Sequence, residues 1–189
     1  MVTQLIFYTQ MYKNLLFCIF IRGLPGAGKS SLSKAFSTTF KAEILDPDKL
    51  NLQPNEKPLK NERLKTFKYR RLLEKCINYL DENTDVVWEQ PWRKIVNIER
   101  TVNQITNLSI VSTKEIKFLI VEISINKKTS WERSKRKFRN RSQFEEYVKK
   151  YQDYNLPFPY LKLDGTKTAP ELVLETISWI QSFSSDKKN

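Results

Sequence analysis

Short apolar runs alternate along the chain with longer stretches in which apolar residues recur at helical spacing. The runs that we expect to form strands are 15–21, 42–45, 85–89, 118–125 and 160–163. The stretches that we expect to form helices are 29–40, 64–80, 95–105, 144–151 and 169–183. The first run, LLFCIFI, is apolar at every position, which is typical of a strand covered on both faces. The pattern predicts an α/β fold with a mainly parallel sheet.

A glycine-rich loop follows the first predicted strand directly. Residues 23–30 read GLPGAGKS and match the phosphate-binding P-loop pattern through Gly23, Gly28, Lys29 and Ser30. Glycines let the backbone approach phosphates, and successive amides at a helix N-terminus attract negative charge. Lys29 is expected to bridge the β- and γ-phosphates, and the Ser30 hydroxyl to bind Mg²⁺. The expected nucleotide-binding residues are Gly23, Leu24, Pro25, Gly26, Ala27, Gly28, Lys29, Ser30 and Ser31.

Carboxylates stand at the ends of the second and third predicted strands. Asp46 and Asp48 follow the second, at the edge of the sheet where α/β folds bind ligands. We expect Asp46 to be the base that accepts a hydroxyl proton, and Asp48 to bind the acceptor, although Asp-Pro-Asp also suits a plain turn. Glu89 ends the third strand as a candidate metal ligand or acceptor contact. Trp92 either lines an acceptor pocket or packs in the core.

A strongly basic segment, KKTSWERSKRKFRNR, follows the fourth predicted strand at 127–141. On a continuous helix, Arg133, Arg136 and Lys137 would share one face, because they stand at i, i+3 and i+4. Arginines suit the oxygens of a transferring phosphoryl group, so we expect a lid over ATP in which Arg133 and Arg136 are catalytic. The alternatives are a solvated charged helix and a nucleic-acid surface that also uses Trp131 and Phe138.

Composition narrows the classes of function. The formal net charge is +12, which favours phosphorylated ligands or polyanions. The chain has no histidine, which excludes a Ser–His nucleophile pair and every zinc site that contains histidine. Cys18 and Cys76 fall at apolar positions and are expected to be free thiols in a reducing cytoplasm. The apolar run of the first strand is too short to span a bilayer, so no membrane partner is expected.

These features together resemble the P-loop kinase superfamily, and within it the group of polynucleotide kinases, zeta toxins and seryl-tRNA kinases. The resemblance covers residues 15–183 and implies a three-layer fold with a five-stranded parallel sheet, order 2-3-1-4-5, and a helical lid. It also implies ATP with Mg²⁺ as cofactors. In that group the loop after strand five approaches the adenine, which would place Gly165 at the base. Glu89 departs from the group, where an aspartate is usual.

The domain boundaries follow from this pattern. Residues 1–13 are expected to be an N-terminal extension, 14–183 a kinase-like domain with its lid at about 127–142, and 184–189 a polar tail. The expected function is transfer of the γ-phosphate of ATP to a hydroxyl of a small molecule or nucleoside. The alternatives are a polynucleotide 5′-hydroxyl kinase and a nucleotide-binding regulator that is not a kinase.

Overall fold

The computed structural model describes residues 14–52, 56–60, 62–108 and 114–185. The expected N-terminal extension lies outside the described residues, as do the last four residues of the expected tail. The remaining two tail residues, Ser184 and Ser185, belong to the last helix.

The described residues form one five-stranded sheet. Its strands are β1 (Leu15–Gly23), β2 (Glu43–Leu45), β3 (Val86–Glu89), β4 (Glu115–Ser124) and β5 (Tyr160–Asp164). They lie in the order β2-β3-β1-β4-β5, and every pair is parallel. The order expected from the resemblance is therefore confirmed. β4 begins three residues before its apolar core because Glu115 pairs with Leu15 at the start of β1.

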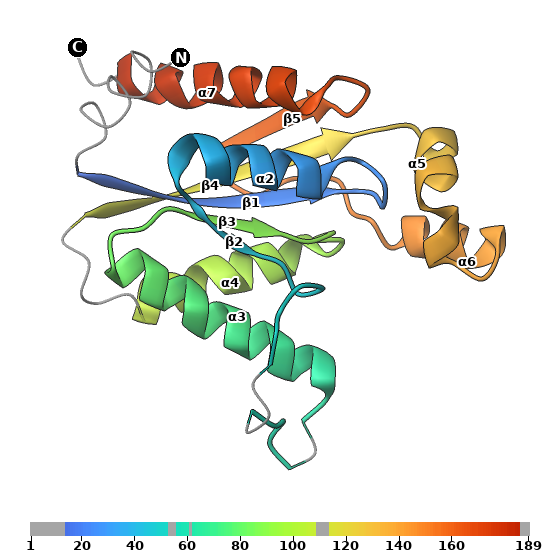
Figure 1. The fold of residues 1–189 in the computed structure, drawn as a ribbon, viewed down its shortest axis with the longest axis horizontal. Coiled ribbons are helices and arrows are strands. Elements are labelled where there is room, and N and C mark those ends of the chain that lie inside the picture. The colour runs from blue at the N-terminus through green and yellow to red at the C-terminus, as the bar shows by residue number, and fades with distance from the viewer. Residues whose placement is uncertain (1–13, 53–55, 61, 109–113, 186–189) are drawn as a thin grey trace.

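Helices cover both faces of the sheet, which completes three layers (Figure 1). The α-helices are α2 (Lys29–Phe40), α3 (Leu64–Asp81), α4 (Ile95–Leu108), α5 (Lys127–Ser134), α6 (Arg141–Lys149) and α7 (Ala169–Ser185). In Figure 1, α2 and α7 lie above the sheet and α3 and α4 below it, while α5 and α6 stand beyond the carboxyl ends of the strands. A short 3₁₀ helix, η1 (Lys135–Lys137), joins α5 to α6.

Two cores, one on each face of β1, hold these layers together. Phe17 and Ile19 pack in the core formed with α2 and α7, whereas Cys18 and Phe20 pack in the core formed with α3 and α4. This alternation is the two-residue period of a strand, and it explains why β1 has no polar side chain before Arg22. Burial of each large apolar side chain contributes about 1.5–3 kcal/mol, so the central strand fixes both helical layers.

The two cysteines meet inside the second core. Both thiols are free and buried, with 3.9 Å between Cys18 Sγ and Cys76 Sγ. Burial raises the pKa of Cys18 well above its ordinary value, since a thiolate would lose its hydration there.

Within the described part of the chain, no helix is long and apolar enough to cross a bilayer.

Candidate functional site

The glycine-rich loop turns from β1 into α2 with two residues in left-handed conformations. Gly26 has a φ of 75° and Gly28 a φ of 103°. A Cβ on Gly28 would meet no atom within 4 Å, so backbone conformation alone requires glycine there. α2 begins at Lys29, the next residue. The loop therefore presents the open N-terminus of α2, which is the arrangement that binds phosphate.

Lys29 lies folded over this loop. Its ammonium donates hydrogen bonds to the carbonyls of Gly23, at 3.0 Å, and Leu24, at 3.2 Å. Burial lowers the pKa of Lys29 to about 8, and the positive charge of Lys137 acts in the same direction. The ammonium is thus held at the phosphate cradle by weak acceptors that a phosphate would outcompete.

Two segments from the far half of the chain pack against the loop. From α5, the Ser130 hydroxyl donates to Pro25 O at 2.8 Å, and a Cβ on Gly26 would lie 2.7 Å from Arg133 Cβ. From the turn after β5, a Cβ on Gly165 would lie only 2.4 Å from Ile125 Cγ2. Glycine at these positions lets the base of the lid and the β5 turn close onto the loop.

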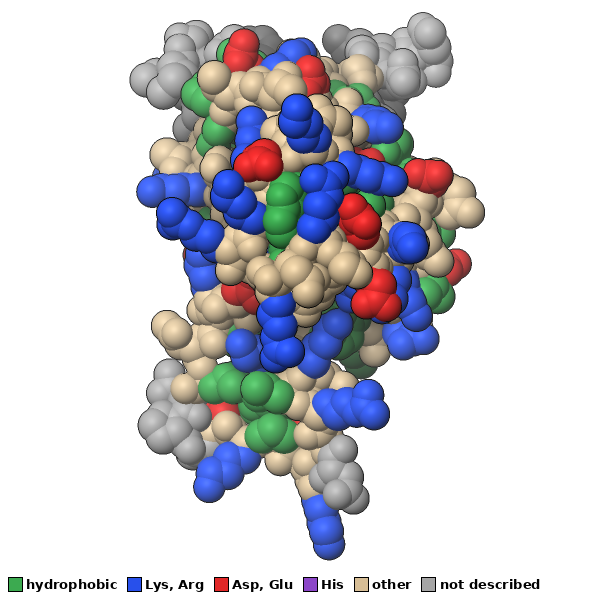
Figure 2. All heavy atoms as spheres, turned by 90° about the vertical axis from the view of Figure 1, so that its right-hand side faces the viewer, with side chains coloured by type: hydrophobic (Ala, Val, Ile, Leu, Met, Phe, Trp, Pro, Cys, Tyr) green, Lys and Arg blue, Asp and Glu red, His purple; other side chains and the backbone are tan. Residues whose placement is uncertain are grey.

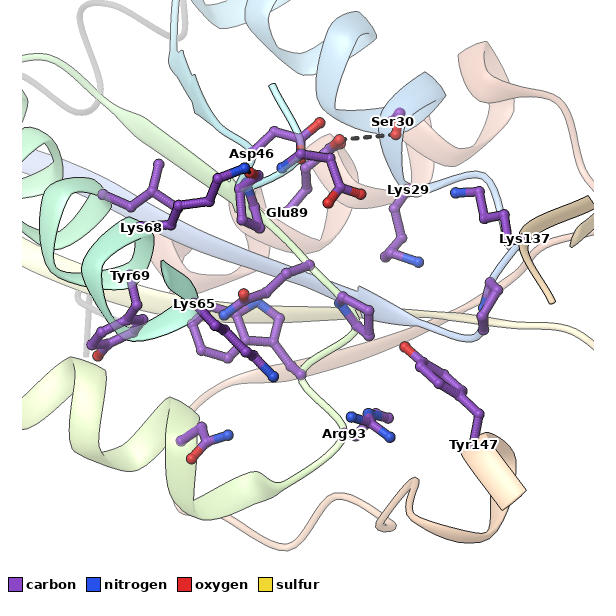
Figure 3. Close-up of a pocket in the computed structure, with 18 of the residues that line it drawn as sticks. Lys29, Ser30, Asp46, Lys65, Lys68, Tyr69, Glu89, Arg93, Lys137 and Tyr147 are labelled. Carbon is purple, nitrogen blue, oxygen red and sulfur yellow. Dashed lines mark hydrogen bonds between the residues drawn. The ribbon is translucent and has the colours of Figure 1, made fainter. Parts of the chain in front are cut away.

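Carboxylates from β2 and β3 meet beside the loop (Figure 3). Ser30 Oγ donates to Glu89 Oε1 at 2.8 Å. Lys49 Nζ lies 2.9 Å from Asp46 Oδ2 and 3.5 Å from Glu89 Oε1, so one ammonium joins the two acids. Asp46 also accepts the backbone amide of Asp48 at 2.8 Å, which fixes its orientation.

The two acids differ in their affinity for protons. Burial acts to raise the pKa of Asp46, but hydrogen bonds from its neighbours and the charge of Lys49 outweigh it, and the net pKa is lowered. Burial raises the pKa of Glu89, and the adjacent Asp46 raises it further. Of the two, Asp46 is therefore the acid whose surroundings favour the ionised form, which is the form that accepts a proton.

The contact between Ser30 and Glu89 suits Mg²⁺. Glu89 Oε2 is buried and has no hydrogen-bond partner among the described residues, so one carboxylate oxygen is free for a ligand. Hydroxyl and carboxylate oxygens are the ligands that Mg²⁺ takes from proteins, together with phosphate oxygens and water. The described residues contain no group of three or more acidic, histidine or cysteine side chains that could hold a metal ion by themselves.

These groups line one wide cavity of about 1390 Å³ at the carboxyl edge of the sheet. Typical small-molecule pockets are roughly 300–1,000 Å³, so this cavity has room for a nucleotide and a second molecule. The P-loop forms one end, and α3, the start of α4 and the lid form the other walls. Asp48 also lines the cavity, and its side chain is exposed.

Trp92 borders the cavity from the core. It is 3% exposed, and its ring packs edge-on against Phe20, with centroids 5.2 Å apart, and against Trp88. Its backbone takes a φ of 46°, which is unusual for a large side chain. Most of Trp92 therefore packs in the core, and only its edge is available to an acceptor.

In the structure the lid consists of α5, η1, α6 and the residues up to Gln152, so it is longer than the expected 127–142, and it is not the continuous helix expected from sequence. α5 ends at Ser134, whose backbone φ of −123° leaves the helical range, and residues 135–137 form a 3₁₀ turn. The expected common face of three cations is therefore wrong, because the break rotates the residues that follow it. Arg133 and Lys137 line the cavity, and Arg136 is exposed and absent from its lining. Arg133 Nη1 donates to Gly165 O at 3.0 Å.

The aromatic side chains of the lid form its own small core. Phe144 is 2% exposed, and the rings of Trp131 and Phe138 pack against it at 5.4 Å and 5.3 Å. Phe138 also contacts the ring of Tyr147. These contacts explain the half-buried state of Trp131 and Phe138, and they weigh against the expectation that both rings are displayed for nucleobases.

Several residues in or beside the cavity had no place in the sequence prediction. Lys49 lies three positions after Asp46, a spacing that could have suggested their ion pair. Lys65 and Arg93 come from segments far apart in the chain and meet the cavity through α3 and the β3–α4 loop. No local pattern indicates such a meeting, because it depends on how the crossovers place α3 and α4.

Comparison with known proteins agrees with this fold. A family model described as an AAA domain matches residues 18–158. No curated protein sequence is similar enough to count as a match. A gluconokinase from Sinorhizobium meliloti 1021 superposes with a TM-score of 0.60 at 16% identity, covering 89% of this chain and 94% of that one.

Two further structures share the arrangement. A fungal RNA kinase gives a TM-score of 0.65 at 15% identity, over 93% of this chain and 90% of that one. The Mycobacterium tuberculosis APS kinase in complex with AMPPNP and APS gives 0.62 at 17% identity, over 88% and 98%. At such identities the likeness shows the fold alone. The family match covers most of the chain, and the chain therefore belongs to the family described as an AAA domain, with the α/β fold of the P-loop kinases.

Proposed function

We propose that this protein is an ATP-dependent phosphotransferase that moves the γ-phosphoryl group to a hydroxyl of a small molecule or nucleoside. The observation that carries the proposal is the position of Asp46, an ionised carboxylate held beside the P-loop in the same cavity. The cavity extends from the P-loop to α3 and the start of α4, which leaves room for an acceptor beside the phosphates. The kinase names of its structural neighbours support the same class.

The proposed roles follow the geometry. The loop amides and Lys29 bind the β- and γ-phosphates, and Ser30 and Glu89 would hold Mg²⁺, which would supply positive charge beside the phosphates. Asp46 accepts the proton of the acceptor hydroxyl as its oxygen bonds to the γ-phosphorus. The bond from that phosphorus to the β–γ bridging oxygen breaks, and ADP leaves.

The lid completes the proposed site. Arg133 is near enough to the loop to stabilise the transferring group, and its bond to Gly165 O ties the lid to the β5 turn. The Asp164–Lys167 turn is the proposed border of the adenine. The AMPPNP complex of a structural neighbour supports ATP as the nucleotide.

A screen of acceptors tests the proposal. The full chain with ATP and Mg²⁺ is incubated with nucleosides, sugars, aminoglycoside antibiotics and 5′-hydroxyl oligonucleotides, and ADP formation and acceptor phosphorylation are both measured. We expect ADP formation to rise with one class of acceptor, in equal amount to the phosphorylated product, and to vanish in Lys29→Ala. ADP formation that never yields a phosphorylated acceptor would favour a regulator or ATPase instead.

A polynucleotide 5′-hydroxyl kinase is the second candidate, because of the charge on the cavity edge. Figure 2 shows this edge of the molecule, where Lys and Arg side chains clearly outnumber Asp and Glu. Exposed lid cations such as Lys135, Arg136 and Arg139 would suit a phosphate backbone that extends beyond the cavity.

A further inference from the structure

The charges that line the cavity are divided between its two ends. The three acids, Asp46, Asp48 and Glu89, gather beside the P-loop, where the charge of each acts on Lys29. The opposite wall has no acid among its lining residues. It carries five cations from the start of α3, from the start of α4 with the loop before it, and from the residue after α6: Lys65, Arg93, Lys94, Arg100 and Lys150.

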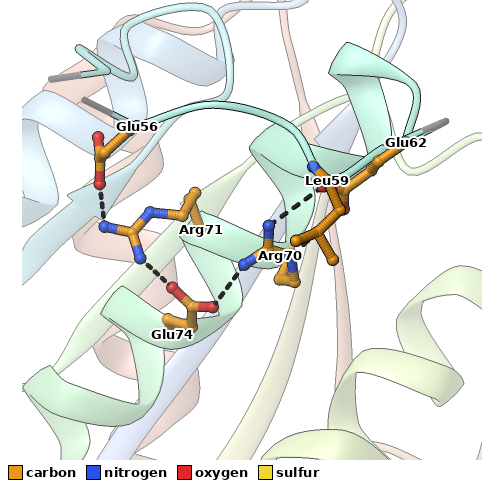
Figure 4. Close-up of polar contacts among 6 residues, drawn as sticks. All are labelled: Glu56, Leu59, Glu62, Arg70, Arg71 and Glu74. Carbon is orange, nitrogen blue, oxygen red and sulfur yellow. Dashed lines mark hydrogen bonds and ion pairs between the residues drawn. The ribbon is translucent and has the colours of Figure 1, made fainter. Parts of the chain in front are cut away.

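Two other cations of α3, Arg70 and Arg71, do form ion pairs with acids. Arg70 pairs with Glu62 at 3.1 Å and with Glu74 at 3.2 Å, and Arg71 pairs with Glu56 and Glu74 (Figure 4). Lys65 stands near the start of this helix, lines the cavity and forms no ion pair with a described carboxylate. α3 therefore neutralises the arginines on its outer side and leaves the cavity side positive.

The remaining cations of the opposite wall are also without acidic partners in the described chain. The Arg93 guanidinium lies 4.3 Å from the centroid of the Tyr147 ring, whereas Lys68 lies on the acidic side of the cavity, where it donates to Pro47 O at 3.1 Å. The backbone carbonyl of Arg93 accepts the amide of Gln152 at 2.9 Å. Figure 3 shows Lys65 and Arg93 directed into the cavity. Arg93 is thus oriented before any ligand binds.

Unneutralised cations on a concave wall repel one another and concentrate positive potential in the space between them. An anion bound there relieves the repulsion, and a guanidinium fork matches phosphate oxygens. The phosphates of ATP are accounted for at the other end by the loop, Lys29 and Arg133. The opposite wall therefore needs a second anion.

We propose that the acceptor itself carries a phosphate group, bound by Lys65, Arg93 and Arg100, in addition to the hydroxyl that is phosphorylated. This inference rests on the proposed phosphotransferase function, because it concerns the acceptor of that reaction. The phosphate belongs either to a phosphorylated small molecule or to the phosphodiester next to the 5′-terminal nucleoside of a polynucleotide. Both present the same chemistry to the wall.

Binding to the nucleotide-filled protein tests this without turnover. The full chain is saturated with AMPPNP and Mg²⁺, so that the P-loop is occupied, and is titrated calorimetrically with matched pairs. The pairs are the four ribonucleosides with their 3′-monophosphates, and neutral hexoses with hexose monophosphates. We expect the phosphorylated member of one pair to bind about tenfold tighter or more, as charge-assisted hydrogen bonds to a phosphate predict.

Charge-removing variants locate the binding site. Lys65→Gln and Arg100→Gln should each lower the affinity for the phosphorylated compound of the pair by about tenfold and leave the affinity for the neutral compound unchanged. Lys75→Gln is the matched control, because Lys75 is an exposed lysine of α3 that does not line the cavity. It should change neither affinity. Thermal unfolding of all three variants checks that each is folded.

The outcomes separate the two proposals. Equal affinity within every pair, or an equal loss in Lys75→Gln, overturns the phosphate subsite even if a neutral acceptor is phosphorylated. If binding depends on the phosphate but the bound compound is not phosphorylated, the result supports the phosphate subsite and contradicts the proposed phosphotransferase function. A 5′-hydroxyl oligonucleotide that binds tighter than its terminal nucleoside 3′-monophosphate identifies a polynucleotide as the source, and equal affinity identifies a small molecule.

Discussion

A single ammonium, that of Lys49, shows how closely the acidic groups of the site depend on one another. It holds Asp46 and Glu89 together, lowering the pKa of the first while the second stays raised. Binding of Mg²⁺ beside Glu89 would compete with Lys49 for the same carboxylate. In the free protein the Lys49 ammonium therefore lies where a metal cation could bind, and its positive charge reduces the repulsion between the two adjacent carboxylates.

Asp46→Asn should remove the proton acceptor and keep the shape of the side chain. We expect phosphotransfer to fall by about 10²-fold or more, with affinity for ATP largely retained, as for loss of a general base. The measurement is kcat with the acceptor found in the screen, beside AMPPNP affinity. Asp48→Asn is the control from the same turn, and a larger loss there would transfer the role to Asp48.

Nucleotide binding should take up a proton. Because the pKa of Lys29 is lowered to about 8, the free protein keeps this proton below pH 8 and loses it above. Phosphates beside the ammonium raise that pKa again, so affinity for AMPPNP should fall as the pH rises above 8. Calorimetry in buffers of different ionisation enthalpy, at about pH 8.5 and about pH 6.5, should show uptake only at the higher pH. The Lys29→Met variant should show no proton uptake at either pH. Proton uptake that persists in this variant would mean that a group other than Lys29 takes up the proton.

Among the elements, the lid is the one whose form departs from its sequence pattern. Its basic residues permit a longer helix, but α5 ends where the Ser134 hydroxyl donates back to Ser130 O at 2.6 Å. A serine that bonds to the carbonyl four residues before it favours a bend. The break leaves Arg133 on the side of the loop and turns Arg136 to solvent.

The two arginines should therefore differ in function. We expect Arg133→Ala to lower kcat by about 10²-fold, since an arginine at a transferring phosphoryl group supplies several kcal/mol. Arg136→Ala should change kcat by less than about threefold, as an exposed group outside the cavity. Steady-state kinetics of both variants, with binding to single-stranded RNA measured in parallel, checks this. Equal losses in kcat would mean that the lid closes further than its present form.

For the whole molecule, the fold could be predicted from sequence, but the basic wall of the cavity opposite the P-loop could not. A strand such as β1 is visible in sequence because residues 15–21 are all apolar, and the loop after it is visible because three of the chain's four glycines lie within six residues. Asp46 and Glu89 could be placed since both end strands of one parallel sheet. Lys65, Arg93 and Lys150 are separated by long stretches of chain, and only the packing of α3, α4 and the lid brings them to one cavity.

The net charge of +12 leads to a prediction about salt. If the acceptor is a small molecule, few phosphates are neutralised, and raising salt from about 50 to about 200 mM should lower kcat/KM by no more than about threefold. A polynucleotide that contacts several cations should lose far more, with a log–log slope of about 0.7 per phosphate contact. Rates across that salt series, for the acceptor and for a 5′-hydroxyl oligonucleotide, decide between them.

The lid is joined to the domain at both ends by polar contacts. Ser130 bonds to Pro25 at its entry, and Gln152 at its exit joins Arg93 O and accepts the amide of Ile95 with its side chain. Arg22 binds the Gln152 carbonyl as well. The part of this segment that follows Arg133 therefore lies between fixed ends. Related sequences could replace that part with loops of other length or charge, and so acquire new acceptors, while Arg133 and the phosphate cradle keep their positions.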